Sequence, residues 1–120
     1  MNQPQPVEIR LRKKSRVLEI EFDDGKRFSL PFEYLRVSSP SAEVRGHGPG
    51  QEVLQTGKAQ VGIDAIEPAG HYALKLVFDD GHDTGLYTWQ YFYELGTHQA
   101  ARWQAYLDRL SAAGYSRQPD

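Results

Sequence analysis

Apolar and polar residues alternate along the first thirty positions in the way typical of half-buried strands. The runs 7–11 and 17–22 place apolar residues at every second position, with charged residues between them. Because successive side chains of a strand point to opposite faces, this period of two predicts two strands with one buried face. Asp24 and Gly25 supply the positive φ that a tight hairpin turn needs, and 28–30 is the predicted return strand.

The same hairpin pattern occurs a second time. The sequence Phe-Asp-Asp-Gly at 22–25 recurs at 78–81, an offset of 56 positions. Three apolar pairs keep this offset: Leu18 and Leu74, Ile20 and Leu76, and Leu30 and Leu86. Each copy therefore predicts a strand, an Asp-Asp-Gly turn, a short return strand and the start of an aromatic-rich helix. In the first copy, Phe28 and Leu30 of the return strand are expected on the inner face, and Leu86 corresponds to Leu30.

Helix signals follow both copies. Pro31 fits the first position of a short helix over 32–36, where its missing N–H costs nothing. After the second copy, Thr88 is predicted to cap a helix that runs to about Leu95 and ends at Gly96.

The last helix is predicted to begin after Thr97, which can cap it, and to end at Gly114. Its apolar residues share one face at spacings of three or four: Ala100, Trp103, Leu107 and Leu110. These elements predict an α+β fold: a small antiparallel β-sheet core built from two repeated hairpins, short helices after each repeat and a C-terminal helix covering one face. We predict a single domain over 7–113, with flexible tails at 1–6 and 114–120.

The middle of the chain, 37–60, has no periodic pattern and contains Gly-His-Gly-Pro-Gly at 46–50. A loop of this length inside a compact domain is uncommon and often functional. A strand resumes at 61–63, and Ile66 is out of phase with it, which predicts a bulge before Pro68.

Composition narrows the classes of function. The chain has no cysteine, which excludes disulfides, thiolate metal sites and a cysteine nucleophile. Its 14 Lys+Arg and 16 Asp+Glu give a net charge of −2, whereas general nucleic-acid binders are normally basic. Neither a signal peptide nor an apolar run of membrane-spanning length is visible. We therefore expect a cytoplasmic protein that binds neither nucleic acid nor membrane.

The second hairpin turn departs from the first in its chemistry. It carries His82, Asp83 and Thr84 where the first copy has Lys, Arg and Phe. In one interpretation these are solvated turn residues. In the other, His82 lies beside the glycine-rich segment, so that His47 and His82, with Asp83 or a serine, line one shallow site. Imidazoles with a carboxylate bind zinc or iron, although no histidine lies three or four positions from another.

Other signals for catalysis are weak. The paired aspartates precede glycine in tight turns, where Asp is favoured because it bonds the local backbone. No Gly-x-Ser-x-Gly elbow is present, and the glycines at 46–50 lack the Lys-Ser/Thr of a phosphate-binding loop. Among the aromatic residues at 87–93, Trp89, Phe92 and Tyr93 fit the core and its rim, and the remaining tyrosines fit a partner surface.

Two stretches carry a resemblance to a known family. Phe-Asp-Asp-Gly-His-Asp-Thr-Gly-Leu-Tyr-Thr-Trp at 78–89 and Leu-Arg-Val-Ser-Ser-Pro-Ser-Ala-Glu at 35–43 resemble the gamma-butyrobetaine hydroxylase-like N-terminal domain. The resemblance is closer to the stand-alone bacterial members, a family of unknown function, and it covers nearly the whole chain, residues 7–112.

The resemblance implies an accessory domain. In the 2-oxoglutarate- and iron-dependent hydroxylases this domain accompanies a separate catalytic domain, which this sequence does not contain. There it holds a structural zinc through three cysteines and a histidine, at the positions of Ser39, Ser41, Val44 and His82. Serine hydroxyls are poor zinc ligands, so the usual zinc site is not expected. The domain also resembles a segment attached to P-loop iron–sulfur carrier proteins, which implies an accessory role in cluster or metal handling.

Two hypotheses of function follow, and a small independent enzyme is a third, less favoured one. The favoured hypothesis is a non-enzymatic accessory or binding domain, an adaptor whose protein partner is an iron–sulfur assembly or carrier protein. The alternative is a zinc- or iron-binding domain that uses His47, His82 and Asp83. The candidate binding residues are Arg36, Ser39, Ser41, His47, Gly48, Gly50, His82, Asp83, Thr84, Tyr87 and Trp89.

Overall fold

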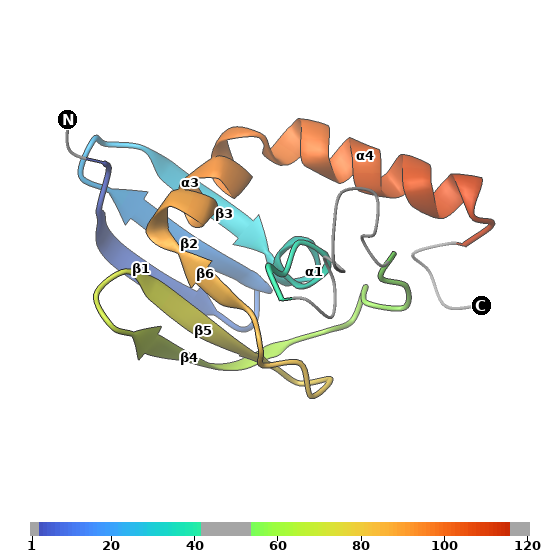
Figure 1. Ribbon diagram of the computed structural model, residues 1–120, viewed down its shortest axis with the longest axis horizontal. Coiled ribbons are helices and arrows are strands. Elements are labelled where there is room, and N and C mark those ends of the chain that lie inside the picture. The colour runs from blue at the N-terminus through green and yellow to red at the C-terminus, as the bar shows by residue number, and fades with distance from the viewer. Residues whose placement is uncertain (1–2, 42–53, 116–120) are drawn as a thin grey trace.

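The computed structural model describes residues 3–41 and 54–115 (Figure 1). The strands form two three-stranded antiparallel sheets within these residues, in the orders β1-β2-β3 and β4-β5-β6. The elements are β1 (Pro6–Arg12), β2 (Val17–Phe22), β3 (Arg27–Pro31), α1 (Phe32–Val37), β4 (Ile63–Ala69), β5 (Ala73–Phe78), β6 (Leu86–Thr88), α3 (Trp89–Thr97) and α4 (Gln99–Ala112). The predicted α+β class and the two hairpins, each followed by a helix, are confirmed.

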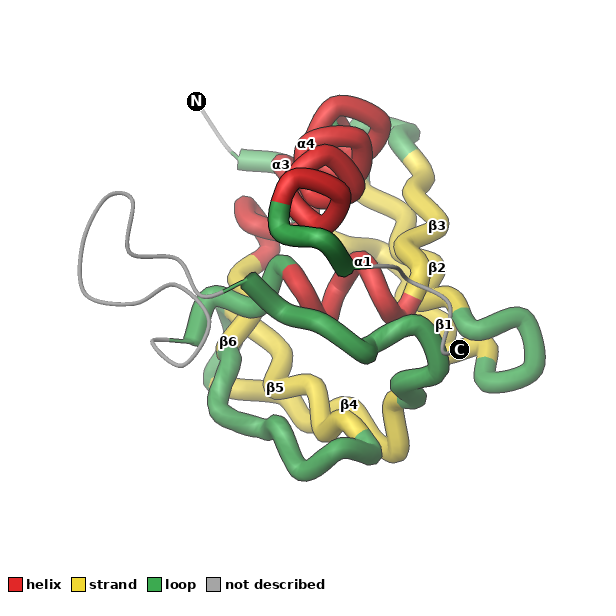
Figure 2. Tube along the Cα trace, turned by 90° about the vertical axis from the view of Figure 1, so that its right-hand side faces the viewer, coloured by secondary structure: helices red, strands yellow, loops and turns green. Residues whose placement is uncertain are grey.

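The inward face of each hairpin forms the core. The alternating apolar residues of β2 and β5 are all buried: Leu18, Ile20, Phe22, Leu74, Leu76 and Phe78. Figures 1 and 2 show α4 above α1, on the side away from β4 and β5. The rings of Tyr34 in α1 and Trp103 in α4 meet edge to face, with centroids 6.2 Å apart. No helix in the described part of the chain is long and apolar enough to cross a membrane.

The first aspartate of each Asp-Asp-Gly turn accepts a hydrogen bond from a backbone amide just before the neighbouring strand, β1 or β4. The backbone N–H of Gln5 donates to Asp23 over 3.2 Å, and that of Gly62 donates to Asp79 over 2.9 Å. Since Gln5 is bonded in this way and β1 begins at Pro6, the ordered sheet starts earlier than the predicted boundary at Val7.

The second aspartate closes the turn itself. Asp24 accepts from the backbone N–H of Lys26 over 3.0 Å, and Asp80 accepts from that of His82 over 3.2 Å. The glycines that follow have φ of 88° and 90°, as the turn prediction required. The sequence repeat is therefore also a repeat of hydrogen bonds.

The two return strands differ by one residue. Leu18 pairs with Leu30 in the first sheet, but Leu74 pairs with Tyr87 in the second. Leu86, expected on the inner face, is therefore exposed, because a shift of one residue turns a side chain to the opposite face. The extra residue lies at 83–85, which leave the strand ladder.

The register shift in β4 lies between Ile63 and Ala65, close to the predicted bulge. α3 continues to Thr97 instead of ending at Gly96, and His98, not Thr97, is the N-cap of α4. The side chain of His98 makes no capping hydrogen bond. On α4, Ala100 is exposed and Tyr106 takes a buried position instead.

The predicted cap of α3 is present, and it has a measurable consequence. The Thr88 hydroxyl accepts a hydrogen bond from the backbone N–H of Tyr91 over 3.1 Å. We expect Thr88→Ala to lower the free energy of unfolding by about 1 kcal/mol, because an N–H of the first helical turn loses its acceptor. Thr88→Ser keeps the hydroxyl and is expected to retain most of the stability. Urea unfolding followed by circular dichroism measures both, and equal losses in the two variants would contradict the capping role.

Candidate functional site

Two buried polar residues from distant segments meet where α1 ends. The Ser39 hydroxyl lies 2.8 Å from Nε2 of His82, and these residues are 1% and 5% exposed. The same hydroxyl accepts a hydrogen bond from the backbone N–H of Ser41 over 3.2 Å. The interpretation of His82 as a solvated turn residue is therefore wrong, because burial leaves its ring beside Ser39 and not in water.

The 83–85 segment, which holds the extra residue of the second return strand, packs against the same end of α1. The Ser41 hydroxyl lies 2.7 Å from that of Thr84 in the 83–85 segment. Gly85 is buried beside Ser39 and Pro40, and a Cβ on this glycine would overlap the Ser39 hydroxyl. Glycine is required here because the backbone itself forms the wall against which the Ser-Pro-Ser segment packs.

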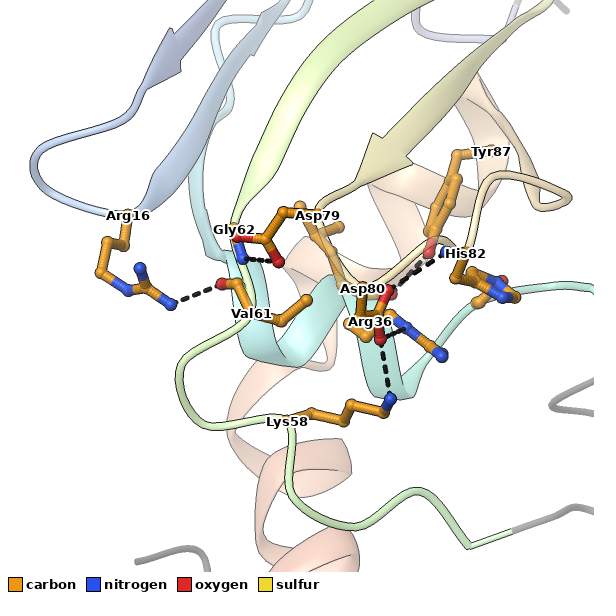
Figure 3. Close-up of polar contacts among 11 residues, drawn as sticks. Arg16, Arg36, Lys58, Val61, Gly62, Asp79, Asp80, His82 and Tyr87 are labelled. Carbon is orange, nitrogen blue, oxygen red and sulfur yellow. Dashed lines mark hydrogen bonds and ion pairs between the residues drawn. The ribbon is translucent and has the colours of Figure 1, made fainter. Parts of the chain in front are cut away.

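Tyr87 adjoins this cluster and is fully buried (Figure 3). Its hydroxyl donates to the backbone carbonyl of Leu35 over 2.5 Å. Burial raises the pKa of the Tyr87 phenol well above its ordinary value, so the group stays neutral and acts as a donor. Tyr87 thus ties the end of α1 to β6.

Three charged residues, Arg36, Lys58 and Asp80, lie next to this buried cluster. Asp80 accepts from Nε of Arg36 over 2.9 Å and from Nζ of Lys58 over 2.7 Å, both at Oδ2 (Figure 3). Its other oxygen accepts from the His82 backbone N–H. Arg36 is 6% exposed, whereas Lys58 and Asp80 remain partly accessible. Three segments of the chain therefore converge on one carboxylate.

The lowered pKa of Asp80 predicts how the stability of the fold depends on pH. Burial alone would raise it, but hydrogen bonds from Lys58, the His82 amide and Arg36 lower it from 3.8 to about 2. A carboxyl with a lowered folded-state pKa stabilises the fold above its unfolded pKa, and this stabilisation is lost as pH falls through the folded pKa. We expect the stability difference between the wild type and Asp80→Asn to shrink between pH 4 and pH 2. Urea unfolding at several pH values tests this, and a constant difference would contradict it.

The structure brings most of the predicted site residues together and separates others. Arg36, Ser39, Ser41, His82, Thr84 and Tyr87 form the cluster described above. Asp83 is exposed on the adjoining turn. Trp89 bonds the carbonyl of His71, at the opposite end of β5, so it is not part of the cluster. The predictions for His47, Gly48 and Gly50 lie outside the described residues.

Two residues of the site were missed. Asp80 was interpreted as a turn residue, which is correct for its Oδ1 but not for its Oδ2. Lys58 lies in the aperiodic middle segment and carries no motif. The sequence carries no signal for either contact. The structure shows that the second oxygen of Asp24 also accepts from a distant residue, the Tyr93 hydroxyl, so the two copies use this oxygen in the same way.

Comparison with known proteins identifies the family of this chain. The family model described as "Gamma-butyrobetaine hydroxylase-like, N-terminal" matches residues 9–93. The chain belongs to this family. No curated protein matches the sequence. The gamma-butyrobetaine hydroxylase-like match spans both hairpins and the start of the helical part, and therefore includes every described residue of the cluster.

Two solved structures share nearly the whole fold, and a third shares most of it. Two structures determined in solution by NMR are 52% and 55% identical, with TM-scores of 0.85 and 0.83. They cover 99% and 98% of this chain, which covers 94% and 88% of theirs. A crystal structure from Acidithiobacillus ferrooxidans, of unknown function and in the DUF971 family, is 42% identical with a TM-score of 0.65. That match covers 77% of this chain and 92% of the other.

The residues of this gamma-butyrobetaine hydroxylase-like domain do not fit the zinc site that the resemblance implied. At two of the implied ligand positions, Ser39 and His82 bond each other, and at a third, Ser41 bonds Thr84. Val44 lies outside the described residues. Within 3–41 and 54–115 there is no group of three His, Cys, Asp or Glu residues able to hold a metal ion. Hydrogen bonds between side chains connect these segments instead.

Proposed function

We propose that this domain is a non-catalytic binding module that holds a protein partner on the surface around Arg36, Lys58 and Asp80. The observation that carries the proposal is the convergence of three segments on the Asp80 carboxylate, with Lys58 and Asp80 still accessible. Buried hydrogen bonds of Ser39, His82 and Tyr87 support this surface from below. A rigidly supported, partly exposed charged surface suits recognition, since complementary charges set specificity and association rate.

A catalytic role for the Ser39–His82 pair is less well supported. The Ser39 hydroxyl already bonds His82 and the Ser41 amide, so a substrate would have to displace both partners before the hydroxyl could react. A nucleophile needs both an adjacent base and access to the reacting atom. The pair therefore has the geometry of a structural hydrogen bond.

We further propose an iron–sulfur assembly or carrier protein as the partner and the cytoplasm as the location. The support for the partner is the family resemblance, which is an analogy at family level. The support for the location is the absence of cysteine, which fits a reducing compartment.

The test is cross-linking and co-purification from the native cell with a matched pair of variants. Lys58→Ala removes a cation of the proposed surface, whereas Lys75→Ala removes one that pairs with Glu67 on β4. We expect a specific partner to be captured by the wild type and by Lys75→Ala, and to be depleted several-fold with Lys58→Ala. Equal capture by both variants would count against this surface.

A further inference from the structure

We propose that Arg36 recognises a carboxylate group of a protein partner. This inference rests on the proposed function, because it names the chemistry by which the same surface would hold that partner. It starts from one unmet donor. Nε of Arg36 donates to Asp80, but Nη1 is buried and has no hydrogen-bond partner among the described residues.

An unpartnered guanidinium nitrogen inside a protein is unusual. Guanidinium groups carry five N–H donors and remain charged, so burial without an acceptor is costly. The aromatic ring of Phe78 lies below the group, 5.9 Å from Cζ, and supplies no acceptor oxygen. An incoming acceptor would remove this cost, which makes Nη1 a point where a ligand gains more than it would at an exposed arginine.

Several charged residues surround Arg36, and they nearly balance. Arg36 and Lys58 share the single carboxylate of Asp80, which leaves one positive charge in excess among these three residues. The neighbouring Asp79 accepts from the Gly62 backbone amide, and Asp83 is exposed on the adjoining turn. The carboxylates of Asp79 and Asp83 offset this excess, so the preference for an acceptor group comes from Nη1 itself, because a guanidinium nitrogen can only donate and offers no ligand to a metal ion.

A carboxylate is the anion that the geometry suits. The guanidinium is planar and presents parallel N–H donors that match the two oxygens of a carboxylate. Asp80 already occupies the Nε side with a carboxylate, so a second one at Nη1 would repeat the same contact on the other side. Aspartate and glutamate side chains and the C-terminal carboxylate of a partner share this chemistry.

The experiment is an NMR titration of the ¹⁵N-labelled full chain. The probes are an acidic peptide of alternating Glu and Gly with both ends blocked, the same peptide with Gln for Glu, an unblocked Gly peptide with a free C-terminal carboxylate, and inorganic phosphate. The Arg36 Nε–H and His82 amide resonances report binding. We expect them to shift with the acidic peptide and not with the Gln peptide; a response to the Gly peptide as well assigns the C-terminal carboxylate as a second source.

Matched variants connect the response to Arg36. Arg36→Lys keeps the positive charge but loses the parallel N–H donors of the guanidinium, and we expect it to weaken binding of the acidic peptide about tenfold or more. Arg12→Lys, an exposed arginine paired with Glu19, is expected to bind as the wild type does. Lys58→Gln leaves Arg36 in place and is expected to weaken binding several-fold through the lost charge. It provides a folded variant if Arg36→Lys lowers stability.

Several outcomes overturn the inference. No shift with any peptide would mean that Nη1 is served by a buried water or by no ligand. An equal response to inorganic phosphate would overturn the assignment to a carboxylate, as would equal weakening by Arg36→Lys and Arg12→Lys. Cross-linking separates this failure from that of the proposed function. A partner lost with Lys58→Ala but retained with Arg36→Lys leaves the function standing and removes Arg36 from recognition.

Discussion

Replacing Gly96 by alanine is expected to lower the free energy of unfolding by about 1–3 kcal/mol, the usual cost of overpacking. Inside a helix this substitution normally stabilises by up to about 1 kcal/mol. Here a Cβ would overlap the ring of Phe28 at Cγ and both Cδ atoms. These atoms lie at the root of the side chain, so the ring has little freedom to move aside. The sign of the effect should therefore be the reverse of the helix expectation.

A double-mutant cycle isolates this cause. In a Phe28→Ala background the ring is gone, and Gly96→Ala should then become neutral or stabilising. Urea unfolding of the four proteins, with the slope m compared throughout, provides the measurement. If Gly96→Ala destabilises both backgrounds equally, the contact between α3 and Phe28 is not the reason that residue 96 is glycine.

Replacing His82 by alanine is expected to cost about 2–3 kcal/mol, because it opens a cavity and leaves the buried Ser39 hydroxyl without its imidazole partner. His71→Ala is the matched control. Its side chain is exposed at the β4–β5 turn, and its carbonyl, which Trp89 uses, is retained. We expect this variant to remain within about 0.5 kcal/mol of the wild type.

The midpoint of urea unfolding for the two histidine variants tests the structural role of His82. A shift confined to His82→Ala confirms that the second turn is anchored in the interior. Similar midpoints for both variants would show that the Ser39–His82 hydrogen bond contributes nothing measurable to stability. The comparison also sets a limit on binding experiments, because any His82 variant must be shown to fold before its affinity is interpreted.

Much of the fold could be predicted because its signals are local. The alternation of apolar residues in β2 and β5, the Asp-Gly turns and the Thr88 cap each involve residues only a few positions apart. Two predictions for single positions were wrong: His98 and not Thr97 is the N-cap of α4, and Tyr87 and not Leu86 is buried, because the second return strand is shifted by one residue.

The candidate site could be predicted only in part. The departure of His82 from its repeat pointed to the turn that packs against Ser39, and both residues were among the candidates. Neither Lys58 nor the second role of Asp80 was found, because they meet across 22 residues of sequence without a motif.

Local patterns in the chain specify two repeated hairpins with helices after them, because strand period, turn chemistry and capping act between near neighbours. Which polar groups meet depends instead on the three-dimensional packing. A one-residue shift in the second return strand leaves residues 83–85 off the ladder, beside the end of α1, and Arg36 reaches Asp80 across 44 positions. Such contacts depend on how the two sheets and α1 pack together, and packing is a property of the whole chain that no local pattern contains.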